Sequence, residues 1–213
     1  DNFLKEGETP KAGVDVGGYN TAWMDPGTEL IKINGVYRSS IIIFPKNGKL
    51  PWDQKKRRQY FAKDYRRGFK RTDHPELRGV GERCIVGFGS SAGPPMMNVL
   101  YNNNYQIVQS PGYVMIMAEM IHDSRIIRLE GSHLPELIDP WMGDSIGRWE
   151  GDTLVVETRN FNYQHIHRAA LRHYFAISKD AKVTELFKRI SDTEIMYRFS
   201  VDDPDLYKSS WQG

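Results

Sequence analysis

Residues 101–129 read YNNNYQIVQSPGYVMIMAEMIHDSRIIRL. Short apolar runs separated by a Pro-Gly turn and by the segment MIHD predict three antiparallel strands, over Tyr105–Gln109, Tyr113–Glu119 and Ser124–Leu129. These strands place Glu, His, Asp and Arg among Met and Ile. Such a mixture is more typical of a ligand cavity than of an ordinary core.

Further strands follow in the same order along the chain. Ile146–Glu150 and Thr153–Asn160 flank a Glu-Gly-Asp turn, and Val183–Ile190 and Thr193–Val201 flank a Ser-Asp turn. The last strand alternates apolar and polar residues, as a half-buried strand does. About seven strands in meander order predict a mainly β fold with minor α. The sheet is expected to be curved and antiparallel, or to close into a small barrel of calycin or lipocalin type, because closure removes exposed edges.

The chain as a whole is predicted to form one domain, residues 1–213, because 213 residues with 39% apolar content can bury a sizeable core. Residues 1–98 would hold an N-terminal arm, a basic helix and, from residue 72, a Gly/Pro-rich loop. Residues 99–213 would form the β core. So long a loop in a compact domain is usually functional or packed across a surface.

A basic segment, Asp53–Arg71, reads DQKKRRQYFAKDYRRGFKR. It carries nine Lys or Arg against two Asp, a local charge of +7 in a chain of net charge +2. Phe61, Tyr65 and Phe69 recur every four residues, which predicts an amphipathic helix. Such a helix either binds nucleic acid or an anionic membrane surface, or docks its aromatic stripe on the domain with its charges in water. We favour the second interpretation, because no nucleic-acid motif accompanies the helix.

Several function classes are disfavoured by what the sequence lacks. No apolar run approaches the roughly 18 residues of a membrane span, so no such span is expected. There is no glycine-rich phosphate loop, GxSxG or HExxH motif, which disfavours nucleotide-dependent chemistry, serine hydrolysis and zinc proteolysis. The single cysteine, Cys84, excludes an intramolecular disulfide, and we interpret it as a small buried residue.

The candidate chemistry centres on Glu119, His122 and Asp123, where one predicted strand ends and the next begins. A histidine beside carboxylates exchanges protons near neutral pH, so His122 is the predicted acid or base, oriented by Glu119 or Asp123. Arg125 and Arg128 fall on opposite faces of the next strand. An inward Arg125 would stabilise an enolate or phenolate, or pair with Glu119. The alternative is a salt-bridged turn without chemistry.

The strand before this turn supplies the predicted pocket wall. Tyr113, Met115 and Met117 share a face with Glu119, and burial in an apolar pocket would raise the pKa of that acid. The alternative is core packing with Glu119 at the rim. Other substrate contacts are predicted from polar side chains elsewhere, although asparagines are also ordinary turn residues: Tyr101, Asn103, Tyr105 and His165.

A histidine cluster follows in the second half of the chain. His165 and His167 form an HxH pair, which on a strand points both imidazoles the same way. With His173 or His133 the pair would make a three-histidine metal site with an open position. We favour substrate contact and a second proton-transfer group, His167 or His173, and predict neither a metal nor another cofactor.

Long motifs cover most of the chain: YNNNYQIVQSPGYVMIMAEMIHDSRIIRLEG at 101–131, GDSIGRWEGDTLVVETRNF at 143–161 and ELFKRISDTEIMYRFSVDDP at 185–204. In these motifs the chain resembles a large, mostly uncharacterised family of bacterial proteins, many of them secreted. The resemblance implies an extracytoplasmic location, periplasmic or secreted, in preference to a cytoplasmic one, and it implies no particular reaction. Between Asn160 and Thr184 the chain departs from the family's pattern.

These observations favour an enzyme, a cofactor-independent lyase or isomerase that works by acid-base proton transfer. Its substrate would be small and partly apolar, such as an aromatic, polyketide-like or terpenoid compound. The alternative is a non-catalytic barrel that binds a hydrophobic ligand, and a weaker one is a metal-dependent enzyme that uses the histidine cluster. The expected partner is a small molecule and not nucleic acid, and self-association is left open.

Overall fold

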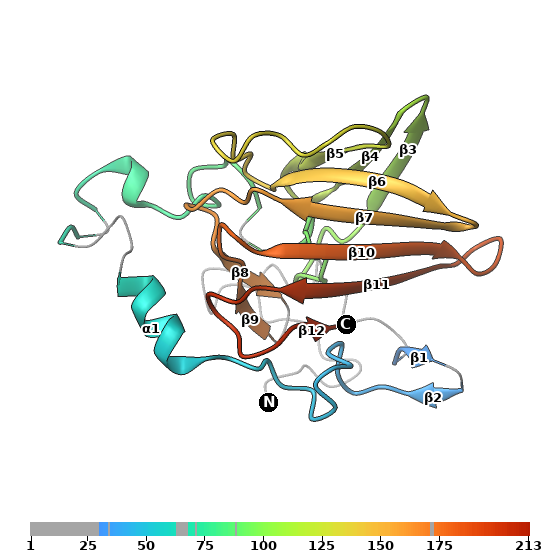
Figure 1. The fold of residues 1–213 in the computed structure, drawn as a ribbon, viewed down its shortest axis with the longest axis horizontal. Coiled ribbons are helices and arrows are strands. Elements are labelled where there is room, and N and C mark those ends of the chain that lie inside the picture. Colours follow the sequence, from blue (N-terminus) through green and yellow to red (C-terminus); the bar gives the residue numbers. More distant parts are fainter. Residues whose placement is uncertain (1–29, 34, 63–67, 71, 88, 171–172) are drawn as a thin grey trace, which may run out of the picture.

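The computed structural model describes residues 30–33, 35–62, 68–70, 72–87, 89–170 and 173–213, with the backbone alone at 169, 170 and 173 (Figure 1). Eight of its strands form one sheet in the order β12-β11-β10-β7-β6-β5-β4-β3. Neighbouring strands run antiparallel except β5 and β6, which pair in parallel. The bounds are β3 Tyr105–Ser110, β4 Tyr113–Ala118, β5 Ser124–Arg128, β6 Asp144–Glu150, β7 Thr153–Arg159, β10 Lys182–Arg189, β11 Ile195–Asp202 and β12 Trp211–Gln212.

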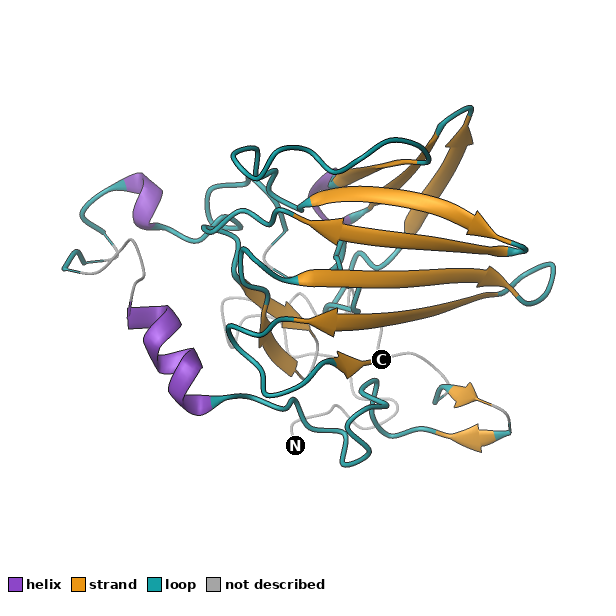
Figure 2. Ribbon diagram, in the orientation of Figure 1, coloured by secondary structure: helices purple, strands orange, loops and turns teal. Residues whose placement is uncertain are grey.

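The sheet is curved and open (Figures 1 and 2). Its two outer strands, β3 and β12, do not pair with each other, and β12 has only two residues with which to form a closing ladder. The predicted mainly β fold with minor α is therefore confirmed in its curved-sheet form. The described strands do not close into a calycin-like barrel.

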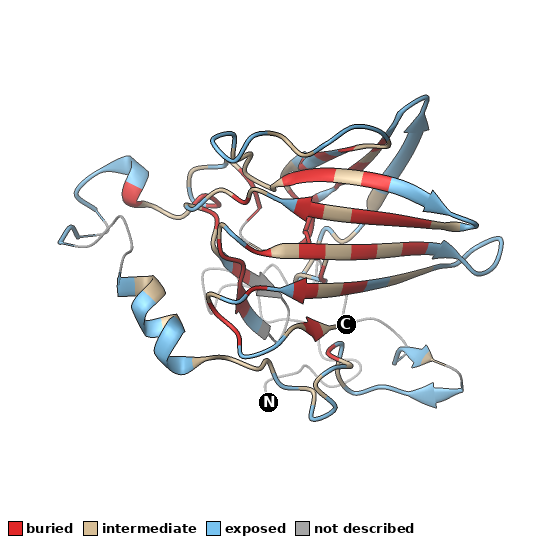
Figure 3. Ribbon diagram, viewed as in Figure 1, coloured by how far each residue is buried: buried red, intermediate tan, exposed pale blue. Residues whose placement is uncertain are grey.

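Alternating burial shows which face of each strand packs inward (Figure 3). Along β4 the buried residues are Val114, Ile116 and Ala118. Along β10 they are Val183, Glu185 and Phe187, so a glutamate occupies a position at which the strand period places an apolar side chain. This inward glutamate becomes important at the site.

Two short ribbons and a few helical turns complete the described structure. The ribbons are β1 Lys32–Ile33 with β2 Val36–Tyr37, and β8 His167–Ala170 with β9 His173–Ala176. The helical segments are α1 Gln54–Ala62 and the 3-10 turns η2 Pro75–Leu77 and η3 Met120–His122. Residues 1–29 of the predicted arm lie outside the described residues. Within the described ranges, no helix has the length and apolar character of a membrane span.

The basic helix α1 is shorter than the predicted segment, and one residue of the predicted stripe, Phe61, contacts the domain. Asp53 caps its start by accepting the backbone N–H groups of Lys55 and Lys56, both at 3.0 Å. Its contacts include those of two adjacent aromatics: the Tyr60 hydroxyl accepts a backbone N–H, and the Phe61 ring stacks on His167. Of the predicted stripe, Phe61 thus makes a contact and Phe69 is exposed, while Tyr65 lies outside the described residues.

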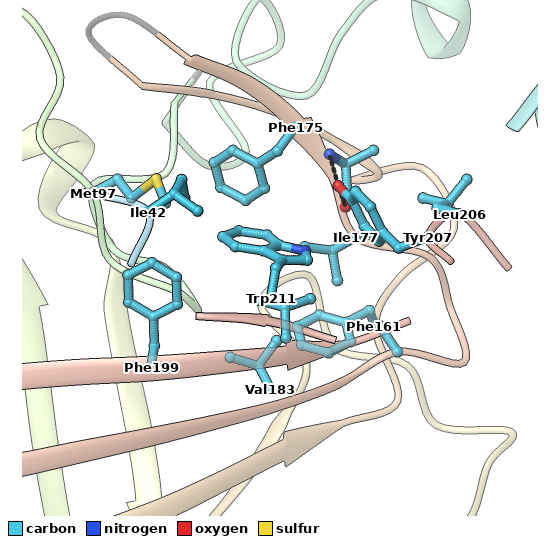
Figure 4. Close-up of a cluster of buried hydrophobic side chains, with 13 residues drawn as sticks. Ile42, Met97, Phe161, Phe175, Ile177, Val183, Phe199, Leu206, Tyr207 and Trp211 are labelled. Atoms are coloured by element: carbon cyan, nitrogen blue, oxygen red, sulfur yellow. Dashed lines mark hydrogen bonds between the residues drawn. The ribbon is translucent and has the colours of Figure 1, made fainter. Parts of the chain in front are cut away.

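The main core is aromatic and lies against the inner face of β10, β11 and β12 (Figure 4). Trp211 is fully buried, and the rings of Phe175 and Phe199 each meet it edge-on at 5.6 Å between centroids. A second apolar cluster lies farther along the sheet: Val114, Ile116, Ile127, Leu154, Val156 and Phe187. The Gly/Pro-rich loop packs across the inner face, with residues 90–95 buried. The site lies beside this loop.

Candidate functional site

A cavity of about 640 Å³ lies where the turn between β4 and β5 meets the Gly/Pro-rich loop. We call it the site cavity, and three segments line it: residues 84–86, 121–126 and 140–145, together with Arg128 and Leu134. It brings together three predicted catalytic residues, His122, Asp123 and Arg125. Its volume is in the range of small-molecule sites, roughly 300–1,000 Å³.

The cavity wall is formed by backbone in an unusual conformation. Ile121 and His122, at the end of η3, have φ angles of 55° and 48°, and Cys84 across the cavity has a φ of 53°. Left-handed conformations are costly for residues other than glycine and cluster at functional sites. Cys84 is exposed, so its interpretation as a buried residue was wrong. Cys84 instead lines the cavity with an exposed side chain, at a point where the loop backbone is left-handed.

The two acid-base candidates differ in exposure. His122 is exposed, whereas Asp123 is buried, with 8% of its surface exposed. The Asp123 Oδ2 accepts the backbone N–H of Gly87 at 2.7 Å. Burial raises the pKa of Asp123, and the hydrogen bond from Gly87 partly offsets this. The turn therefore holds a fixed buried acid next to an exposed imidazole.

Arg125 points inward, but its partner is not the predicted Glu119. Both of its terminal nitrogens contact the Glu185 carboxylate: Nη2 lies 3.1 Å from Oε1, and Nη1 contacts Oε2. Both side chains are buried, at 2% and 0% exposure. The Tyr197 hydroxyl donates to Glu185 Oε1 at 2.7 Å and accepts the Met96 backbone N–H at 2.8 Å. This bidentate pair is a fixed part of the interior beneath the cavity.

A second group of charged side chains, centred on Asp144, lies in another part of the cavity lining. Asp144 accepts two hydrogen bonds from Arg128 Nη2, at 2.8 and 2.9 Å, and contacts His133 Nδ1 at 2.9 Å. The Leu134 backbone N–H also donates to it at 2.9 Å. Both carboxylate oxygens are thus engaged, so Asp144 holds the segment after β5 in place.

Glu119 and the predicted pocket wall lie away from the site cavity. The Glu119 carboxylate is exposed and accepts the Asn104 side-chain amide at 2.8 Å. The buried face of β4 is that of Ile116, and the opposite face is more exposed, with Tyr113 at 50%. The side chains of Tyr113, Met115 and Met117 therefore do not form an inward wall. Both faces of β4 are apolar, and the face that carries Ile116 is the one that packs on the core.

The predicted polar contacts upstream of β3 are also distributed elsewhere. The Asn103 amide bonds with the backbone N–H and carbonyl of Val99, which is the turn role weighed as the alternative. The Tyr105 hydroxyl donates to the Ser91 carbonyl at 2.7 Å, and burial raises its pKa to about 12. Tyr101 is half-buried and does not line the site cavity.

The histidine cluster is split. His165 is buried, and burial, reinforced by Arg168, lowers its pKa to about 2, so its imidazole is neutral. His167 is exposed, stacks on Phe61 and contacts the Tyr174 hydroxyl. The His173 side chain lies outside the described residues. Among the described residues, no three His, Cys, Asp or Glu side chains are grouped to hold a metal ion.

A second cavity of about 650 Å³ lies beside α1 and holds no histidine in its lining. Tyr60, Phe61, Ile166 and Lys179 contribute to its walls. Because the site cavity joins a histidine, a buried acid and strained backbone, it is the better candidate for chemistry.

Comparison with known proteins finds no matching family model, no matching curated protein and no matching solved structure. The resemblance to the bacterial family, and the extracytoplasmic location that it implies, therefore stay predictions.

Proposed function

We propose that the chain is a cofactor-independent lyase or isomerase that transfers protons on a small, partly apolar molecule bound in the site cavity. The observation that carries the proposal is that His122 and Asp123 line one cavity of about 640 Å³ together with apolar side chains. A largely apolar pocket with a few convergent polar groups is the usual form of a small-molecule site.

His122 is the proposed proton carrier. An exposed imidazole exchanges protons with both substrate and solvent near neutral pH. Asp123 lies within electrostatic range of His122, and the positive charge of a protonated His122 lowers the pKa of the Asp123 carboxyl, against the effect of burial. The left-handed backbone at Ile121 and His122 sets the direction in which the His122 side chain leaves the backbone.

The apolar lining supports a substrate with a ring or a hydrocarbon skeleton. Ile85, Ile126, Trp141 and Met142 contribute to the cavity walls. Aromatic, polyketide-like and terpenoid compounds suit such a surface. Arg125 does not bond the substrate through its terminal nitrogens, because the Glu185 carboxylate engages both of them and balances the charge.

A non-catalytic binding protein is the second candidate for the same cavity. The observation that favours it is the position of Glu119 and His167, which do not line the cavity, so fewer proton-transfer groups converge than the sequence predicts. The two candidates differ in one measurable property: only an enzyme exchanges substrate protons.

Hydrogen exchange tests the proposal even while the product is unidentified. The purified protein is incubated in D₂O with a panel of aromatic and terpenoid ketones and acids, and deuterium incorporation is followed by NMR. We expect exchange into at least one compound and a loss of roughly 100-fold or more in His122→Gln, the range of general acid-base catalysis. His74→Gln is the matched control, since His74 is exposed and only caps η2.

Two outcomes contradict the proposal. If hydrogen exchange is undiminished in His122→Gln, His122 is not the proton carrier. Tight binding of panel compounds without exchange in the wild-type protein identifies a binding protein instead.

A further inference from the structure

Buried hydrogen-bond donors without partners gather behind the site cavity. In the described part of the chain, five buried side-chain nitrogen or oxygen atoms have no hydrogen-bond partner. Four of them belong to three residues: Ser91 (Oγ), Arg125 (Nε) and Arg168 (Nε and Nη2). All four groups can donate, and a buried donor without an acceptor destabilises the fold, more so when it is charged.

These residues share one neighbourhood around Asp123. A Cβ atom on Gly87 would lie 3.3 Å from Asp123 Oδ2 and 3.4 Å from Ser91 Oγ, so both oxygens flank Gly87. Arg168 lies within electrostatic range of both Asp123 and Arg125, which line the cavity. Ser91 therefore lies beside Asp123, and Arg168 lies near Asp123 and Arg125, although neither Ser91 nor Arg168 lines the cavity itself.

Arg168 is the least satisfied of the three. Its side chain is buried, and its Nη1 lies 2.6 Å from Nδ1 and 2.5 Å from Nε2 of His165. Since the Trp141 carbonyl, 2.9 Å from His165 Nδ1, can only accept, Nδ1 carries the proton and Nε2 accepts from Arg168. His165 is thus a neutral partner, and no described carboxylate is hydrogen-bonded to Arg168.

Asp123 compensates the Arg168 charge only in part. Its Oδ2 is taken by the Gly87 N–H, and it acts on Arg168 through space. Burial lowers the pKa of Arg168 to about 9, with Asp123 opposing the change and Arg125 adding to it. An arginine this deeply buried normally has an anion in direct contact.

The free edge of Arg168 defines the chemistry of that anion. Nε and Nη2 lie on the same side of the planar guanidinium, and their two parallel N–H groups match the two oxygens of a carboxylate. The Nε–H of Arg125 and the Ser91 hydroxyl lie in the same neighbourhood as further donors.

We propose that the molecule bound in the site cavity is a carboxylate, and that Arg168 binds its carboxylate group through Nε and Nη2. The carboxylate enters beside Asp123, whose side chain rotates away from the Gly87 N–H to admit it. This inference rests on the proposed small-molecule function of the cavity and narrows the substrate to carboxylic acids. Arg168 is a binding residue in this scheme, and His122 remains the proton carrier.

Matched pairs of acids and amides test the inference at pH 7 and constant ionic strength. Benzoate, cinnamate and 1-naphthoate are each compared with the corresponding amide by isothermal titration calorimetry. In the wild-type protein we expect at least one acid to bind roughly 10- to 100-fold more tightly than its amide, the usual range for a charged hydrogen-bonded contact. If no acid is preferred over its amide, the inference is overturned.

Variants then test which residue causes the preference for the acid over its amide. Arg168→Gln should remove the preference for the acid and leave amide binding unchanged, and Arg168→Lys, which keeps the charge but not the fork, should restore part of it. Arg148→Gln is the matched control, because Arg148 is 61% exposed and paired with Glu150. A full acid preference in Arg168→Gln overturns the inference and assigns the free donors to buried water.

Two further measurements keep the test decisive. If Arg168→Gln does not fold, the Arg168 Nε–H resonance of the wild-type protein is followed by NMR: it must shift with the preferred acid and not with its amide. His122→Gln should retain the acid preference while losing hydrogen exchange. An acid preference without any role for His122 would leave this inference standing and overturn the proposed function.

Discussion

The inner face of the sheet is stabilised in two different ways along its length. Around Trp211 the interior is aromatic, and its rings pack edge-on with centroids 5.6 Å apart (Figure 4). Two residues along β10, Val183 of the aromatic core gives way to Glu185, which forms a buried ion pair with Arg125. Apolar packing is non-directional and tolerates substitution, whereas a buried charge depends on one particular partner.

This difference indicates in which region the protein keeps residues that reduce its stability but serve its function. The buried charges Arg125 and Asp123 line the site cavity, and Arg168 lies near both of them, while the aromatic core shares no residue with that lining. Buried ion pairs are seldom the most stable filling for an interior. Their concentration beside the cavity therefore supports a role in ligand binding more than in folding.

The largest expected effect comes from breaking the Arg125–Glu185 pair. Glu185→Gln keeps the shape of the side chain but leaves Arg125 as a buried charge without a counterion, and it should lower the free energy of unfolding by about 3–5 kcal/mol. Urea denaturation followed by circular dichroism measures this loss. The exposed Arg148–Glu150 pair provides the control, where Glu150→Gln should cost about 0–1 kcal/mol.

A double variant shows whether the loss comes from the charge. Arg125→Met combined with Glu185→Leu removes both charges, and it should recover most of the stability that Glu185→Gln loses. If the double variant is less stable than the single one, the pair stabilises the fold outright, and the contrast with the aromatic core is mistaken.

The second largest effect concerns a buried carboxylate that has no cation hydrogen-bonded to it in the described structure. Asp203, beside the aromatic core, accepts the backbone N–H and the hydroxyl of Ser178, both at 2.8 Å. Burial raises its pKa from 3.8 to about 6, although the Ser178 hydrogen bonds oppose the change. A raised carboxyl pKa stabilises the fold at low pH. That contribution is complete below pH 3.8, and it is lost as pH rises through 6, to a total of about 3 kcal/mol at most.

Asp203→Asn isolates this contribution. The difference in unfolding free energy between wild type and variant should change by up to about 3 kcal/mol between pH 4 and pH 7, with the wild type favoured more at the acidic end. Other carboxylates titrate equally in both proteins and cancel. A difference that is constant across this range shows that Asp203 titrates normally in the folded protein.

Most strands were predictable because period-two patterns and turn residues are local signals. The predicted strands Tyr113–Glu119 and Thr153–Asn160 differ from β4 and β7 by one residue each. The β8–β9 ribbon and the parallel pairing of β5 with β6 were not predicted, since both are set by tertiary packing. Periodicity also could not select the inward face of β4, because both of its faces are apolar.

The site residues likewise divide into those that could be predicted from local sequence and those that could not. His122 and Asp123 were predictable because they follow one another in a turn between two predicted strands, so local sequence brings them together. Arg125 on β5 and Glu185 on β10 are 60 positions apart in the chain and have two strands between them in the sheet, so their pairing is visible only in the folded structure. An inward glutamate flanked by Val183 and Phe187 was the one available signal. No sequence signal marked Arg168, because its proposed binding role depends on which hydrogen-bond donors remain unpaired in the folded structure.

The smallest expected effect is in the aromatic core. Phe199→Leu keeps most of the side-chain volume in a cluster whose other rings can adjust, so the unfolding free energy should fall by only about 1 kcal/mol. The matched substitution in the charged region is Glu185→Gln, which changes shape less and should cost several times more. Urea denaturation of both variants under one set of conditions compares them directly. A loss in Phe199→Leu as large as that in Glu185→Gln would mean that the aromatic rings also require one particular arrangement, and the two regions would then differ in chemistry but not in tolerance.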